Sequence, residues 1–143
     1  MAAVEIELRR TYRFCASHRY WRDEWSEAQN LAAFGKCALP HGHGHNYRLT
    51  VIVIGTPDAK TGMVVDLTAL DRVVEEHVVG AFDHRNINAQ VPYFRNVIPT
   101  TENLVSYVFD VLHARLPRGR LAAVTLEEDE FLSATCRAPA PTS

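Results

Sequence analysis

The sequence predicts an α+β domain: a four-stranded antiparallel sheet with two helices inserted between the second and third strands. Residues 4–18 alternate between apolar and polar side chains, and residues 48–54 form a β-branched run, so both segments are predicted strands. Two stretches with helical apolar spacing follow, and then two short extended segments at 121–127 and 131–136. An antiparallel sheet with one wet face and both helices on the other accommodates this order.

The bulk composition limits the class of protein. With 143 residues, 47% of them apolar and 22% charged, the chain is expected to form one domain over residues 1–143. Its ordered core is expected at about 4–137, with a disordered tail at 138–143. The net charge of 15 − 17 = −2 gives no general attraction to nucleic acid or membranes. The sequence predicts neither a signal peptide nor a membrane-spanning run, and from three irregularly spaced cysteines we expect a reducing, cytoplasmic location.

The first predicted strand ends on a histidine. Its apolar face continues in phase to His18, whereas Cys15 falls on the polar face without an evident partner. The aromatic and charged residues 19–36 that follow are expected to form a long loop or a short irregular helix. The apolar positions of the strand are Val4, Ile6, Leu8, Tyr12, Phe14 and Ala16.

Three further histidines, His41, His43 and His45, alternate with glycines just before the β-branched run. Residues two apart on a strand share a face, so His43 and His45 project side by side on the face that also carries Tyr47. Periodicity alone admits a second register that includes His41. We favour His43 and His45 because the strand signal follows them at once, which leaves His41 in the loop.

Both predicted helices have recognisable starts. Asp66 is the expected N-cap of the first, which is expected to end near Gly80. The second begins at residues 99–103 with Thr100 or Thr101 as its cap, carries Glu102 in its positive first turn, and closes at Pro117.

His18, His43 and His45, converging from two strands, suggest a zinc site. Three nitrogen ligands leave a fourth position open, which is the arrangement of catalytic zinc, because structural zinc is usually closed by four protein ligands. An open zinc polarises a bound hydroxyl or carbonyl group. The alternative is a histidine- and glycine-rich loop that binds metal only adventitiously.

Other reactive residues each have two interpretations. Cys37, near Lys36 and the zinc site, is either a thiol that ionises at neutral pH and serves as a base or an inert buried thiol. Asp83 and His84 are an acid beside a base, suited to proton transfer or to turn formation. Glu127 is either a carboxylate that accepts two N–H bonds from a heterocycle edge or a solvated acid beside a turn. Cys136 has no partner that the sequence identifies.

Taken together, the motifs resemble the 6-pyruvoyltetrahydropterin synthase and 6-carboxytetrahydropterin synthase family, and are most similar to its pyruvoyl members. The resemblance spans roughly residues 4–137. It implies the tunnelling fold, in which small subunits assemble into a homo-hexamer, a dimer of trimers, with active sites at subunit interfaces. The matching segments are Phe14-Cys15-Ala16-Ser17-His18, Phe34-Gly35-Lys36-Cys37, His43-Gly44-His45-Asn46-Tyr47, Thr61-Gly62-Met63-Val64, Asp83-His84-Arg85-Asn86, Val91-Pro92-Tyr93-Phe94, Thr100-Thr101-Glu102-Asn103 and Glu127.

The resemblance also implies the chemistry. The implied substrate is 7,8-dihydroneopterin triphosphate, which loses triphosphate while protons move between side-chain carbons. The implied base is Cys37, assisted by Asp83 and His84. The implied roles of the other residues are zinc ligation by His18, His43 and His45, anchoring of the pterin ring by Glu127, and pocket formation by Thr101 and Glu102.

The spacing of the cysteine leaves the product open. Five residues separate Cys37 from His43, as in the pyruvoyl enzymes, whereas three separate Cys37 from His41, as is usual in the sister enzyme that makes 6-carboxytetrahydropterin. A third alternative is a zinc-binding protein of the same fold without catalytic activity.

Overall fold

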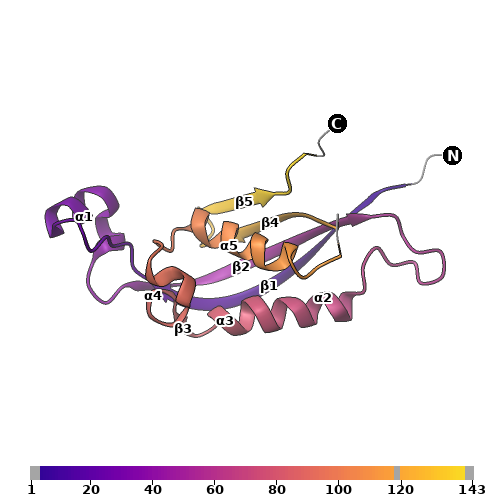
Figure 1. Cartoon of the computed structure of the whole chain (residues 1–143), viewed down its shortest axis with the longest axis horizontal. Coiled ribbons are helices and arrows are strands. Elements are labelled where there is room, and N and C mark those ends of the chain that lie inside the picture. Colours follow the sequence, from indigo (N-terminus) through magenta and orange to yellow (C-terminus); the bar gives the residue numbers. More distant parts are fainter. Residues whose placement is uncertain (1–3, 118–119, 141–143) are drawn as a thin grey trace.

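The computed structural model of the protein describes residues 4–117 and 120–140. Two long strands lie side by side through the middle of an elongated molecule, with α1 at one end and both termini toward the other (Figure 1). The strands are β1 (Ile6–His18), β2 (His43–Gly55), β3 (Arg85–Asn86), β4 (Leu121–Glu127) and β5 (Ser133–Arg137). The helices are α1 (Glu27–Phe34), α2 (Leu67–Val74), α3 (Gly80–Phe82), α4 (Ile87–Gln90) and α5 (Thr101–His113).

Over the described residues, 4–117 and 120–140, the sheet has five strands in the order β3-β1-β2-β4-β5. The predicted four-stranded antiparallel sheet is therefore wrong in its detail, although the α+β class is right. The additional strand, β3, pairs parallel to β1 through Ala16 opposite Arg85 and Ser17 opposite Asn86. It has only two residues, which is too short for any periodic signal in the sequence.

Helices α2 and α5 pack against the sheet. Leu70 and Val74 of α2 and Leu104 and Val108 of α5 are buried in the same core as the inward residues of the long strands. The inward alternation predicted for the first strand is observed from Tyr12 to His18; the apolar positions near its start are more exposed.

The helix caps follow the sequence signals. The carboxylate of Asp66 accepts hydrogen bonds from the backbone N–H groups of Thr68 and Ala69, and Thr100, one of the two predicted caps, accepts one from Asn103. Past α2 the helix widens into a π-helical segment, Glu75–Val79, and ends at Phe82, close to the predicted end near Gly80. Gly80 permits this path, because a Cβ there would lie 2.8 Å from the carbonyl oxygen of Glu75.

A short helix, α1, lies within the segment expected to be a loop or an irregular helix. Ser26 caps it in a reciprocal capping box with Gln29. The buried amide of Asn30 holds the preceding loop, since it accepts from the backbone N–H of Arg22 and donates to the carbonyl groups of Arg22 and Ser26. This helix carries the chain to the 3₁₀ turn Gly35–Ala38, which contains Cys37.

At the other end of the chain, the backbone N–H of Ala138 still donates to the carbonyl of Ala122, so sheet pairing extends one residue into the predicted tail. Residues 141–143 of that tail lie outside the described residues. Among the helices that the structure describes, none has the length and apolar character needed to cross a membrane.

Candidate metal centre and active site

The pairing of β1 with β2 brings three imidazoles together. His18 lies directly opposite His43, and Ala16 lies opposite His45, so the three histidines share the inward face at one end of the ladder. The turn before β2 keeps His41 out of this group, because His41 adopts a left-handed backbone (φ 73°) and is exposed. Gly42, also left-handed, passes so close to β1 that a Cβ would lie 2.7 Å from the carbonyl oxygen of His18.

Hydrogen bonds fix the orientation of the His18 ring. Its Nδ1 lies 2.8 Å from the carbonyl oxygen of Pro99, just before α5. A carbonyl only accepts, so Nδ1 carries the proton and the lone pair of a neutral ring is on Nε2. Burial, followed by the neighbouring His43, lowers the pKa of His18 to about 4, so the ring is neutral at neutral pH. A carbonyl behind the distal nitrogen is the usual support of a metal-binding histidine.

The donor atoms of the three histidines fit a zinc-sized ion. Nε2 of His18 lies 3.1 Å from Nε2 of His43, while about 3.3 Å is expected between two nitrogens that share a tetrahedral zinc. Nε2 of His45 is buried and lacks a hydrogen-bond partner among the described residues. Each histidine offers a nitrogen within 4.8 Å of the others. A buried, unpaired nitrogen beside two others is costly without a shared partner, and a divalent ion would provide one.

The sequence analysis missed Glu128, which also belongs to this cluster. Its Oε1 lies 3.4 Å from Nε2 of His18 and 3.4 Å from Nε2 of His45, and the residue is only 8% exposed. The inward alternation of β4, Val124 then Leu126, reaches Glu128 two residues later. That continuation is the signal in the sequence, but Glu128 falls between the two predicted extended segments, 121–127 and 131–136. A carboxylate of the same chain therefore lies next to the three imidazoles.

Glu127 points the other way. It pairs with Arg48 of β2, with 3.5 Å between the Arg48 Nε and the Glu127 Oε2, and its side chain is 35% exposed. Within one chain it does not join the histidines. Of the two neighbouring carboxylates, the one on the histidine side is Glu128.

Tyr20 connects Cys37 to the histidine cluster. The backbone N–H of Tyr20 donates to the carbonyl oxygen of Cys37 over 2.8 Å, and the Tyr20 ring packs edge-on against His18 with centroids 5.1 Å apart. Burial and the nearby negative charge of Glu128 raise the pKa of the Cys37 thiol. This direction is opposite to the ionisation at neutral pH suggested by the sequence. A bound divalent cation would act against both the burial and the carboxylate.

The start of α5 adds another polar group to this region. Thr101 is 1% exposed, and its hydroxyl has no hydrogen-bond partner among the described residues. Glu102, its neighbour, is exposed. Pro99, two residues earlier, is the residue that orients His18, so the start of this helix and the histidine cluster are directly connected.

Asp83 and His84 form a separate cluster with Cys15. Asp83 Oδ2 lies 3.0 Å from Nδ1 of His84, and Asp83 Oδ1 accepts the backbone N–H of Cys15. These bonds to Cys15 and His84 lower the pKa of the Asp83 carboxyl. Cys15 is one residue out of phase with Ala16 and His18, so its side chain is on the opposite face of β1. Among the described contacts of Asp83 and His84, none is to Cys37.

Two hollows adjoin this second cluster. One, of about 410 Å³, is lined by residues that include Cys15, Asn46 and His84. The other, of about 550 Å³, is lined by residues that include Cys15, Asp83, His84 and Glu127.

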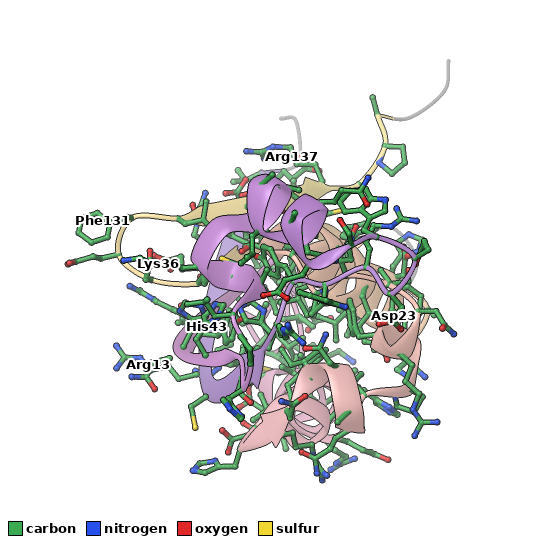
Figure 2. All side chains as sticks on the ribbon, turned by 90° about the vertical axis from the view of Figure 1, so that its left-hand side faces the viewer. Arg13, Asp23, Lys36, His43, Phe131 and Arg137 are labelled. Atoms are coloured by element: carbon green, nitrogen blue, oxygen red, sulfur yellow. The ribbon has the colours of Figure 1, made fainter. Side chains whose placement is uncertain are left out.

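Viewed from the α1 end, His43 lies within the body of the protein, whereas Phe131 projects from the β4–β5 turn (Figure 2). Phe131 is 87% exposed, which is unusual for a large apolar side chain on an isolated chain.

Comparison with known proteins places this arrangement in a family. The family described as 6-pyruvoyl tetrahydropterin synthase matches residues 7–139. The chain is 42% identical over 126 residues to 6-pyruvoyl tetrahydrobiopterin synthase of Homo sapiens, covering 88% of this chain and 87% of the human one. It is 41% identical over 114 residues to the protein of the same name from Drosophila melanogaster, covering 80% of this chain and 68% of the fly one.

Solved structures show the same fold. The 6-pyruvoyl tetrahydropterin synthase of Caenorhabditis elegans superposes with a TM-score of 0.90 at 33% identity, over 97% of this chain and 100% of that one. An uncharacterized protein from Wolinella succinogenes, WS1659, superposes with a TM-score of 0.66 at 19% identity, over 96% of this chain and 100% of that one, which bears on the fold alone.

Proposed function

The chain belongs to the 6-pyruvoyl tetrahydropterin synthase family, and from this premise we propose that it converts 7,8-dihydroneopterin triphosphate to 6-pyruvoyltetrahydropterin with elimination of triphosphate. The observation that carries the proposal is the cluster of three imidazoles with a thiol close by. That combination suits proton abstraction next to an oxygen-bearing carbon.

His18, His43 and His45 hold a zinc ion in this proposal. When bound, the ion would supply Lewis-acid polarisation of the substrate's side-chain hydroxyl groups. The support is the short distance between Nε2 of His18 and Nε2 of His43, the unpaired nitrogen of His45, and the Pro99 carbonyl behind His18. Cys37 abstracts the proton, and Tyr20 holds its backbone in place.

Glu128 is the carboxylate that we assign to the pterin ring, in preference to Glu127. The ring's edge presents adjacent N–H groups like a guanidinium, and a carboxylate accepts two such bonds in parallel. Glu128 is buried on the histidine side, and the buried hydroxyl of Thr101 has an unused hydrogen-bonding capacity. Glu127 and the exposed Glu102 remain candidates for contacts that another subunit would complete.

A homo-hexamer completes the proposed active site. Cys37 is linked to the histidine cluster through Tyr20, whereas Asp83 and His84 contact Cys15, whose side chain is on the opposite face of β1. We assign the relay that serves one chain's Cys37 to Asp83 and His84 of a neighbouring chain. The exposed Phe131 is the kind of residue that assembly covers. Three free cysteines suit a reducing, cytoplasmic compartment.

Product analysis tests the proposal. Zinc-loaded protein is incubated with 7,8-dihydroneopterin triphosphate without oxygen, and the pterin is identified by mass spectrometry. We expect a pyruvoyl side chain and free triphosphate. A carboxy side chain with release of acetaldehyde would instead identify a 6-carboxytetrahydropterin synthase. The exposed position of His41, outside the cluster, disfavours the cysteine-to-histidine spacing usual in that enzyme.

A variant of the proposed base separates an enzyme from a non-catalytic zinc protein. Cys37→Ala should keep its zinc but lose turnover by about 10²-fold or more, the usual contribution of a positioned base. Cys136→Ala is the matched control, because Cys136 is also a half-buried free thiol but lies on the edge strand β5. Equal turnover in both variants would remove Cys37 from the mechanism.

A further inference from the structure

Cys15 is a free thiol that the proposed reaction does not use, yet it lies within a group of potential metal ligands. Its Sγ, a carboxylate oxygen of Asp83 and an imidazole nitrogen of His84 all lie within 4.8 Å of one another. The group is on the sheet face opposite the three histidines and is therefore distinct from their site. It borders the hollow of about 410 Å³, so a ligand can reach it from solvent.

The backbone already positions these donors. His84 adopts a left-handed conformation (φ 59°), which is uncommon for a residue with a side chain. It is held there by its backbone N–H, which donates to the carbonyl of Cys15 over 2.6 Å. Asp83 Oδ1 is fixed in turn by the backbone N–H of Cys15. Two reciprocal bonds thus tie the Asp83–His84 turn to Cys15, the sulfur-bearing residue of β1.

We propose that Cys15, Asp83 and His84 form a second divalent-metal site, selective for thiophilic ions such as zinc. A thiolate, an imidazole and a carboxylate are all ligands that zinc accepts, whereas magnesium and calcium prefer oxygen alone. Zinc requires donors about 3.3–3.8 Å apart. The His84 side chain is 79% exposed, so it can rotate toward Cys15 without disturbing the core. The adjacent hollow leaves room for water or a further ligand.

The consequence for activity rests on the proposed function. In that function, Asp83 and His84 relay protons to and from Cys37. A metal ion bound to Asp83 and His84 would occupy the lone pairs that the relay needs. Zinc then acts in two ways on one chain: the ion at the three histidines supports turnover, and the ion at Cys15 inhibits it. Occupancy of the second site should lower kcat by about 10²-fold, the contribution of a group that transfers a proton.

Cobalt(II) is the probe for the site itself. Purified apo-protein is titrated with Co²⁺ while the near-ultraviolet sulfur-to-cobalt charge-transfer band is followed. The histidine site contains no sulfur ligand, so the band reports a thiolate-bound ion. We expect the wild-type chain to bind two equivalents and to show the band with the second. Cys15→Ser should bind one equivalent without the band, and His84→Ala should weaken the band.

Two control variants make the assignment specific. Cys136→Ser and Cys37→Ser should both retain the band. A band that persists in Cys15→Ser, or a wild-type chain that binds one equivalent and shows no band, overturns the second site. The thermal unfolding midpoint of Cys15→Ser verifies that the variant is folded.

The activity measurement is read separately. Excess zinc should inhibit the wild-type protein but not Cys15→Ser, whose basal turnover should be unchanged. Equal inhibition of both proteins overturns the inhibitory role. If no variant turns over the pterin, the proposed function fails while the cobalt band still decides whether the metal site exists.

Discussion

The two faces of the β1–β2 ladder carry clusters of opposite character. On the inner face, His18 is completely buried and its ring is oriented by Pro99. On the outer face, the His84 side chain is 79% exposed and is attached to a left-handed turn. The inner cluster stands on regular strands, and its donors lie at distances that suit an ion. The outer cluster stands on a loop held by two backbone hydrogen bonds to Cys15.

This difference separates a site that one chain forms by itself from a pair of residues that we expect to act in a neighbouring chain. Buried donors on paired strands have few rotamers left and are ready to bind without rearrangement. The exposed pair can still move, and its proposed target, Cys37, lies with the inner cluster. A sheet separates the two clusters of one chain, so they would work together only across an interface.

Removal of one inner histidine should have the largest effect. His18→Ala is expected to lower zinc affinity by roughly 10³-fold, because structural binding energies of 10–16 kcal/mol are shared among only a few ligands. Zinc content after dialysis and competition with a chromogenic chelator measure the loss. His41→Ala is the control, since its exposed imidazole is outside the cluster. Equal losses in the two variants would contradict the register that we assign to the site.

Mixing two inactive variants tests the division between subunits. Cys37→Ala and His84→Ala should each lose about 10²-fold in turnover. Co-refolded at equal amounts, they should recover about a quarter of wild-type activity, because in random hexamers that share of interfaces pairs an intact Cys37 with an intact His84. If both residues acted within one chain, the mixture would stay as inactive as its components.

The adjacent carboxylates at the end of β4, Glu127 and Glu128, provide a sharper test of which face binds substrate. Glu128→Gln should raise KM by about 10- to 100-fold, since hydrogen bonds to a charged partner contribute about 1.5–3 kcal/mol. Glu127→Gln should change KM less than about twofold, because its ion pair with Arg48 is exposed. Steady-state kinetics measure KM for both variants. A larger increase in KM for Glu127→Gln than for Glu128→Gln would identify Glu127 as the residue that binds the pterin ring.

The smallest effect is expected from the turn that carries the outer pair. The pKa of Asp83 is lowered in the folded chain, chiefly by the backbone N–H of Cys15 and then by His84. Its stabilising contribution is therefore present above the ordinary carboxyl pKa and is lost as the pH falls through the lowered value. Asp83→Asn should be slightly less stable than wild type in urea at pH 7, and the difference should shrink as the pH falls below the ordinary carboxyl pKa. Zinc binding at the inner cluster should not change.

The inner cluster was largely predictable because strand periodicity is local. Alternation over β1 placed His18 on the inward face, and the β-branched run placed His43 and His45 beside Tyr47. Glu128 was missed because the third predicted strand was ended at residue 127, one residue before the next inward position of the same alternation. The two-residue strand β3 and its parallel pairing were beyond reach, since two residues have no period.

The sequence alone determined the α+β class, the family resemblance and the three histidines, because each depends on spacing along the chain. The tertiary structure decided which carboxylate faces the histidines, which direction the pKa of Cys37 shifts, and that Asp83 and His84 contact Cys15. These outcomes depend on which residues meet after folding and how much water they exclude. Neighbouring positions such as 127 and 128 have similar chemistry in the sequence but lie on opposite faces of the folded sheet.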